Sequence, residues 1–358
     1  MNYSMKCWSE RHQVLFGSTL EMILFTLFFP PICLLGIVGN TLNLMVLLGA
    51  EMRSRANSLL ACLAFCDIVF LILMIPHSMA NFNVFALNYS FRWYYLSAKM
   101  HLITFANWSS AVAIWLVVAV CVERVMGIRH PFHTRGHWSR YCMAALVVSI
   151  VVIAGILTSY NHFSHVCIVQ EFCNQTQVMA KCFDVTLDTN ANETALNSAL
   201  NAALIVFLKQ RSVMLYQSIS DSSKKEVKNE QGASLFRRSI DQVLFCFATR
   251  QRTEQRIAIT VVAIVTCFTI TQGPSAVVLS INTFSSTRTV EALTGLNWYQ
   301  LQTVTAFLVI VGKTLNFILF CLSSANFRRR LMCILRNKLK AVQKTRTSTI
   351  NGTLFILL

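Results

Sequence analysis

Seven long apolar stretches separated by polar segments dominate the pattern of this chain. They cover residues 20–48, 57–80, 96–122, 140–160, 195–217, 256–281 and 299–323. Most of them reach the roughly 20 apolar residues that cross the hydrocarbon core of a bilayer. Since a backbone in lipid must satisfy its hydrogen bonds within the segment, each stretch is predicted to be a helix. The pattern therefore predicts an all-α membrane protein built as a seven-transmembrane helix bundle.

The fifth stretch is shorter than the others. From Ala195, about 14 mostly apolar residues precede Lys209, fewer than a comfortable crossing requires. One interpretation is a naturally short or tilted helix. The other is that residues have been lost by exon skipping or by a gene-model error, and we slightly prefer it.

Charge sets the predicted orientation of the bundle. The chain is 55% hydrophobic and 13% charged, with a net charge of +16. With an extracellular N-terminus, 24 of its 31 lysines and arginines fall in cytoplasmic segments, as the positive-inside rule requires. The basic charge thus reflects membrane orientation and not nucleic-acid binding. Four glycosylation sequons lie on the predicted outer side, at Asn2, Asn88, Asn174 and Asn192.

Polar side chains interrupt the first, second and seventh stretches. An amide or carboxylate in lipid needs a partner, so we expect Asn40 to pair with Asp67. Lys313 lies three residues before Asn316 and therefore shares its helix face. We predict that Lys313 pairs with Asp67. The alternative is that Lys313 borders a water-filled cavity.

Several short motifs occur in a fixed order along the chain. They are Gly39-Asn40, Leu63-Ala64-Phe65-Cys66-Asp67, Glu123-Arg124, Cys267-Phe268 with Pro274, and Asn316. After the seventh stretch, Phe327, Leu331, Ile334 and Leu335 share one face of a short helix, with arginines positioned for anionic lipid headgroups. Together these motifs resemble rhodopsin-like (class A) G-protein-coupled receptors, notably invertebrate (nematode) neuropeptide receptors.

The chain departs from that family at several positions. Val125 stands in place of Tyr after Arg124, and Phe317 and Phe320 replace the Pro and Tyr that follow Asn316. Ala106 stands where an amine receptor has Asp, so no fixed carboxylate awaits a protonated amine there. By the resemblance, Lys313 would occupy the place where many relatives hold a sodium ion.

Lys99 occupies the position of the usual third-helix Cys. The usual outer disulfide is therefore absent, or the outer cysteines pair differently. Four cysteines lie on the predicted outer side, Cys7, Cys167, Cys173 and Cys182, and they allow three complete connectivities.

The resemblance implies a function and a set of site residues. Glu123 would hold Arg124 as a switch for heterotrimeric G proteins, and Phe268 with Pro274 would form an activation hinge, unless Gly273-Pro274 only shapes the end of the helix. The ligand pocket expected by analogy comprises His77, Asn81, Ile103, Asn107, Gln272 and Gln302.

The expected function is G-protein-coupled receptor activity in the plasma membrane, with an extracellular neuropeptide as ligand and membrane lipids as further partners. Alternatives are a chemosensory receptor for small molecules, or a signalling-impaired splice isoform with a shortened fifth helix. Without metalloprotease, hydrolase or nucleotide-binding motifs, we expect no enzyme activity, no cofactor and no metal.

The predicted organisation has four parts. They are an extracellular N-terminus (1–19), a receptor domain (20–323) that includes a third cytoplasmic loop (209–255), an amphipathic eighth helix (324–336) and a cytoplasmic tail (337–358).

Overall fold

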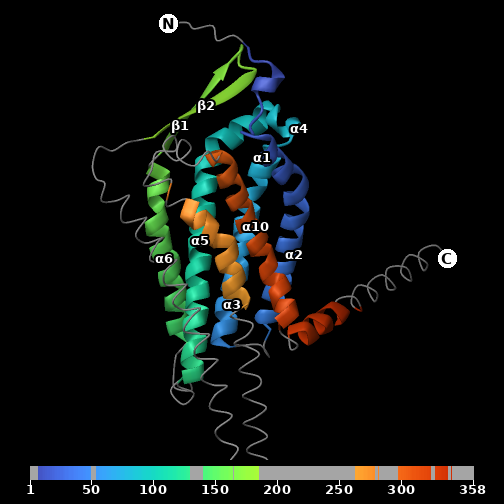
Figure 1. The fold of residues 1–358 in the computed structure, drawn as a ribbon, viewed down its shortest axis with the longest axis vertical. Helices are drawn as coiled ribbons and strands as arrows, with labels where there is room; N and C mark the ends of the chain where they lie inside the picture. Colours follow the sequence, from blue (N-terminus) through green and yellow to red (C-terminus); the bar gives the residue numbers. More distant parts are fainter. Residues whose placement is uncertain are drawn as a thin grey trace, which may run out of the picture.

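The structure is a computed structural model that describes residues 7–49, 54–129, 140–163, 165–184, 263–278, 281, 297–323, 327–337 and 340. Within these ranges, five helices are long and apolar enough to cross a membrane, and a shorter apolar helix spans Ala263–Val278. They stand side by side in one elongated bundle (Figure 1). A two-stranded hairpin lies over one end, which we call the hairpin end; the other is the opposite end. The protein is a helical membrane bundle, as predicted.

The first crossing begins near its predicted start but changes helix type on the way. It consists of α1 (Thr19–Ile23), a π-helical turn η2 (Leu24–Phe28) and α2 (Phe29–Leu47). The Ser18 hydroxyl accepts a hydrogen bond from Glu21 N and caps α1. Pro30 and Pro31 follow the π-helical turn and lie in the first turn of α2. A residue without an N–H is tolerated there.

The second and third crossings form the centre of the bundle. α3 (Arg55–Met79) starts at the Ser54 cap, and a short α4 (Asn83–Ala86) follows. α5 runs from Tyr89 to Arg129, so it extends beyond the predicted 96–122 at both ends. Hydropathy marks only the part of a helix that suits lipid, and the extra turns of α5 carry Arg92 and other polar groups. Asn88 Oδ1 accepts a hydrogen bond from Phe91 N at its start.

The remaining helices complete the described bundle. α6 (Arg140–Phe163) packs on α5, and α10 (Trp298–Ser323) packs on α2. A further helix, 327–337, leaves the bundle axis at the opposite end (red in Figure 1). The fifth stretch, the third cytoplasmic loop, most of the tail, Asn2 and Asn192 lie outside the described residues.

The helix 327–337 is more closely joined to the protein than the amphipathic pattern suggested. Phe327 is buried in the core, and Leu331 and Ile334 pack against the same core. Arg328 Nη1 donates to the carbonyls of Cys321 and Leu322 at 2.8 Å each, which satisfies free C-terminal carbonyls of α10. Much of the apolar face expected to meet lipid thus contacts protein.

Close helix contacts depend on three glycines. A Cβ on Gly36 would lie 2.6 Å from both Leu71 Cδ1 and Thr314 Oγ1, and one on Gly39 would lie 2.6 Å from the Phe317 ring. A Cβ on Gly312 would collide with the Thr271 hydroxyl. Small residues let membrane helices approach closely, and these three draw α2 and the helix Ala263–Val278 onto α10.

The hairpin was not anticipated from the sequence. β1 (His165–Phe172) and β2 (Gln177–Asp184) pair antiparallel, with Cys167 opposite Cys182. Cys173, Asn174 and Gln175 all have positive φ, between 53° and 64°, which lets the chain reverse within four residues. The strands show little alternation of polar and apolar residues, so the usual strand pattern is absent.

The hairpin and residues 7–17 form a joint structure that we call the cap. Cys7 and Cys173 are joined by a disulfide, and Cys167 is also disulfide-bonded. The outer cysteines therefore pair without the position held by Lys99. The Trp8 ring packs edge-on against Phe172 at 5.1 Å, and Trp8 exchanges two hydrogen bonds with the Gln177 amide.

Arg92 fastens the cap to the bundle. Its guanidinium donates to the carbonyls of Val178 in β2, Gln13 in the N-terminal segment and Ala86 in α4. The residue is 5% exposed. A single α5 side chain thus connects three chain segments, and a planar cation with five donors suits that task.

Opening the Cys7–Cys173 disulfide is expected to free the N-terminal part of the cap without unfolding the bundle. Disulfides typically contribute about 2–4 kcal/mol. The double variant Cys7→Ser/Cys173→Ser should therefore expose residues 7–17 to limited proteolysis while the helical circular dichroism stays unchanged. Equal protease resistance of the variant and the native protein would contradict this role; Cys142→Ser, which removes a free exposed thiol, is the control.

Candidate functional site

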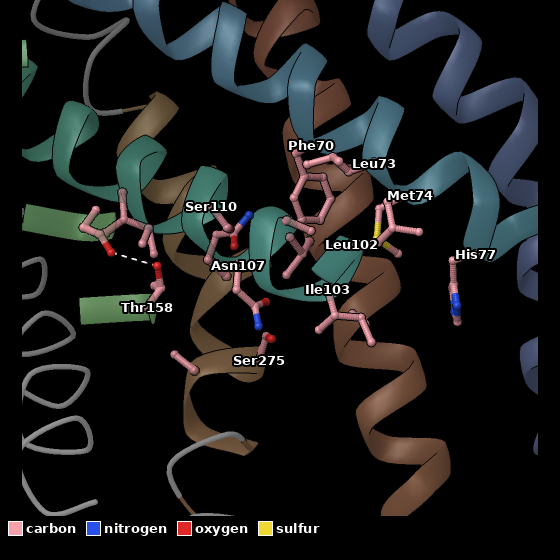
Figure 2. Close-up of a pocket in the computed structure, with 18 of the residues that line it drawn as sticks. Phe70, Leu73, Met74, His77, Leu102, Ile103, Asn107, Ser110, Thr158 and Ser275 are labelled. Atoms are coloured by element: carbon pink, nitrogen blue, oxygen red, sulfur yellow. Dashed lines mark hydrogen bonds between the residues drawn. The ribbon is translucent and has the colours of Figure 1, made fainter. Parts of the chain in front are cut away.

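A cavity of about 390 Å³ opens within the bundle (Figure 2). Its walls come from α3, α5, α6, the helix Ala263–Val278 and α10. Most of the lining is apolar, including Phe70, Met74 and Ile103. Figure 2 shows Asn107, Ser110 and Ser275 gathered in one part of the cavity and His77 in another. The site is therefore an apolar chamber with separated polar groups, as small-molecule pockets generally are.

The cavity contains four of the six pocket residues expected by analogy. His77, Ile103, Asn107 and Gln272 line it, whereas Asn81 and Gln302 do not. The Asn81 amide instead donates to the carbonyl of His77 at 2.8 Å, one helical turn back. The analogy used only the position of each residue along its helix. It contained no information on whether the side chain points toward the cavity or away from it.

A polar cluster around the buried Glu21 borders the cavity near the hairpin end. Glu21 accepts hydrogen bonds from the Tyr299 hydroxyl and, at 2.8 Å, from Gly17 N. Its second oxygen lies 3.5 Å from His77 Nε2, and His77 Nδ1 is 2.8 Å from the Tyr95 hydroxyl. The cluster joins α1, α3, α5 and α10.

Sequence reasoning missed this cluster apart from His77. A signal was present, because Glu21 is a carboxylate at the start of an apolar stretch, where an ionisable group usually has a partner.

Asp67 is the centre of a second buried network. Lys313 Nζ lies 3.0 Å from Asp67 Oδ1, and Asn316 Nδ2 donates to Asp67 Oδ2 at 2.6 Å. Both charged side chains are 0% exposed. Lys313 Nζ also lies 4.7 Å from the centre of the Phe70 ring, within the range of a cation–π contact. The structure thus brings together the carboxylate and the ammonium as the pairing hypothesis expects.

Asn40 joins this network by a different route from the one expected. Its amide donates to the carbonyls of Gly36, at 3.0 Å, and Lys313, at 3.2 Å. Asp67 is not its partner, because both hydrogen bonds of the Asn40 amide go to these backbone carbonyls. Asn43 Nδ2 donates to Asn40 Oδ1 at 3.4 Å and extends the network along α2.

The proposed switch and hinge residues lie on two helices. Glu123 and Arg124 are in the last turns of α5, near the opposite end, and the side chain of Arg124 lies outside the description. Phe268 is buried in the core cluster with Leu116 and Val120 of α5. The helix Ala263–Val278 continues past Pro274, so this proline lies inside a helix and not at its end.

Removing the Lys313 ammonium should leave Asp67 buried and uncompensated. The loss of one member of a buried ion pair typically costs about 3–5 kcal/mol. Lys313→Ala should therefore lower the melting temperature of the purified protein, and sodium should restore part of it because the cation can enter beside the carboxylate. The melting temperature would be compared in sodium chloride and in N-methylglucamine chloride.

The double variant Asp67→Asn/Lys313→Ala is the matched control, because it lacks the carboxylate and should be insensitive to sodium. A Lys313→Ala protein as stable as the native chain, and equally indifferent to sodium, would contradict the pairing.

Comparisons with known proteins agree with this architecture. Residues 28–222 match the family described as "Serpentine type 7TM GPCR chemoreceptor Srw". The Caenorhabditis elegans G-protein coupled receptor F59B2.13 is 37% identical over 368 residues, covering 96% of this chain and 82% of that protein.

Two further C. elegans relatives are more distant. Sex peptide receptor-related protein 2 is 21% identical, covering 87% of this chain and 71% of its own length. Galanin-like G-protein coupled receptor npr-9 is 26% identical, covering 34% of this chain and 28% of its own. With the helical bundle and the match over more than half of its length, the chain belongs to the seven-transmembrane G-protein-coupled receptors, in the Srw family.

Proposed function

We propose that this receptor binds an extracellular peptide at the hairpin end and activates heterotrimeric G proteins at the opposite end. The observation that carries the proposal is the placement of the cavity directly beside the cap. Tyr95 lines the cavity and also packs with Val178 of the hairpin. A ligand in the cavity would therefore contact a wall that supports the cap.

The proposal places the receptor in the plasma membrane with its N-terminus outside. Two disulfide-bonded cysteines of the cap, Cys7 and Cys173, favour an oxidising compartment at the hairpin end. The sequon residues Asn88 and Asn174 are both exposed at this end, where an extracellular location would allow glycosylation. The basic residues concentrate in segments assigned to the other side.

A peptide ligand is supported by the names of relatives. One is called a sex peptide receptor-related protein and another a galanin-like receptor. A peptide could insert one end into the cavity and lay the rest along the cap, so the ligand can be larger than the chamber.

A small chemosensory ligand is the second candidate. The matched family is described as a chemoreceptor family, and a volume of about 390 Å³ suits a small molecule. The two candidates differ in how much they depend on the cap. A small molecule enclosed in the chamber should be indifferent to cap substitutions that do not reach the cavity, whereas a peptide should not be.

Signal transfer is proposed to use Glu123, Arg124 and the Phe268–Pro274 segment. Agonist would stabilise an arrangement in which the helix Ala263–Val278 moves relative to α5 and frees Arg124 for the G protein. Because Phe268 packs directly on the α5 core, a displacement of one helix must be accommodated by the other.

Replacing Arg124 should separate binding from signalling. In cells that express the full chain with an extracellular tag, a peptide library and a small-molecule panel would be screened by calcium and cAMP readouts. We expect a peptide agonist, and Arg124→Ala should abolish its response while ligand binding is retained within about threefold, since the residue lies near the opposite end. Lys344→Ala, which removes one positive charge from the tail, should respond as the native chain does.

The number of receptors at the cell surface is the necessary control. A version with several apolar residues inserted before Asn201 would be counted alongside the native chain. If only the lengthened version reached the surface, this chain would be the signalling-impaired isoform. If agonists came only from the small-molecule panel, the peptide proposal would be wrong.

A further inference from the structure

The cavity carries positive charge and has no described counter-charge. Among the described residues, Lys99 is the only lysine or arginine that lines it, and its Nζ lies 6.0 Å from the centre of the Tyr95 ring. Within the described ranges, no carboxylate lies within 4.0 Å of this ammonium. The part of the cavity wall that the structure describes contains no Asp or Glu. An ammonium held against an aromatic face, without an acidic neighbour, is available to pair with an anion.

The buried carboxylate of Glu21 already has partners. Glu21 lies beside His77 and is 5% exposed. Its Oε2 accepts hydrogen bonds from the Tyr299 hydroxyl and Gly17 N, and its Oε1 lies 3.5 Å from His77 Nε2. Glu21 is not among the described residues that line the cavity, and no ion pair joins it to Lys99.

A second observation concerns Gln272 on the facing helix. Its side-chain Nε2 is buried and has no hydrogen-bond partner among the described residues, and Gln272, which is 8% exposed, lines the same cavity. Leaving a buried donor unsatisfied typically costs about 1–3 kcal/mol. A ligand that offers an acceptor oxygen would recover this cost, whereas a ligand with only donors would not.

We propose that the cavity binds a largely apolar ligand that carries a carboxylate, which pairs with Lys99, and a further acceptor oxygen, which receives the hydrogen bond of Gln272 Nε2. The inference rests on the proposed use of this cavity as the ligand site. A cationic amine would meet repulsion at Lys99 and find no described carboxylate in the wall. The remaining surface, formed by side chains such as Phe70 and Met74, accommodates the apolar body.

Two kinds of molecule offer this chemistry. One is a free small carboxylic acid that enters the cavity whole. The other is a peptide that inserts a free C-terminal carboxylate with an apolar last residue, and the carbonyl of the preceding peptide bond supplies the second acceptor. The probes below separate them.

The test uses matched probes and the purified full chain in lipid nanodiscs. The small probes are 3-phenylpropionic acid, its primary amide and 3-phenylpropylamine. The peptide probes are acetyl-Phe-Leu with a free and with an amidated C-terminus. Apparent affinities are obtained from the rise in melting temperature with probe concentration.

We expect the acid of each responding pair to bind about tenfold more tightly than its amide, the size of a charge-assisted hydrogen bond, and the amine to bind worst. Lys99→Met should reduce the ratio of acid to amide to about one, and Lys99→Arg should restore it. Lys181→Met, which removes an exposed lysine of the hairpin that does not line the cavity, should leave the ratio unchanged. Gln272→Met should weaken the acid and the amide of the dipeptide pair alike, because both keep an internal peptide carbonyl as the second acceptor.

Equal binding of acid and amide, tighter binding of the amine, or a ratio that survives Lys99→Met would overturn the proposal, as would the absence of stabilisation by every acid. A response to the phenylpropionate series alone indicates a free acid, and one to the acetyl dipeptide alone indicates a peptide terminus. These outcomes depend on binding only. Failure of the proposed receptor function would appear separately, as carboxylate binding without any G-protein response in cells.

Discussion

A carboxylate enclosed in the middle of a membrane bundle is the constraint around which this structure is arranged. Asp67 has no access to water, so its charge must be balanced by protein groups. Lys313 and Asn316 supply one partner for each oxygen, and both belong to α10. The requirement therefore ties α3 to α10, and the bond from Asn40 to the Lys313 carbonyl adds α2. Gly36 and Gly39 allow α2 and α10 to approach closely enough for this. One buried charge thus determines how three helices are packed.

At the hairpin end, too, one charged side chain joins several segments of the chain. Here the segments to be joined are a strand, an N-terminal segment and a short helix, and Arg92 binds one carbonyl of each. The Cys7–Cys173 disulfide fixes the cap internally, while Arg92 attaches it to α5. Since the position of the usual third-helix cysteine is not needed to attach the cap, it can hold Lys99, which faces the cavity. The replacement of the usual third-helix cysteine by Lys99 therefore accounts both for the positive charge in the cavity and for the different attachment of the cap.

The sequence predicted the helices well because apolar length is a direct consequence of bilayer thickness. The Asp67–Lys313 pair could also be anticipated, because few side chains in the predicted membrane-spanning stretches can neutralise a carboxylate. The hairpin escaped prediction since its strands lack alternation and its turn uses non-glycine residues with positive φ. Asn81 and Gln302 were misplaced relative to the cavity because rotation about a helix axis depends on packing, which no short motif encodes. The predicted partner of Asn40 was wrong for a related reason. Its actual partners are backbone carbonyls, which every residue has, so no residue type in the sequence indicates them.

The length of α5 determines how a disturbance can travel through the molecule. Its 41 residues correspond to a rod of about 60 Å, longer than a bilayer with its headgroups, at ~40–45 Å. The rod contains no proline, and its only glycine is Gly127, three residues beyond Arg124. Lys99, Asn107 and Arg124 therefore belong to one continuous element without an internal joint. If a ligand in the cavity tilted α5, the whole helix would tilt as one body. The end of α5 that carries Arg124 would then be displaced without a change in any intervening element.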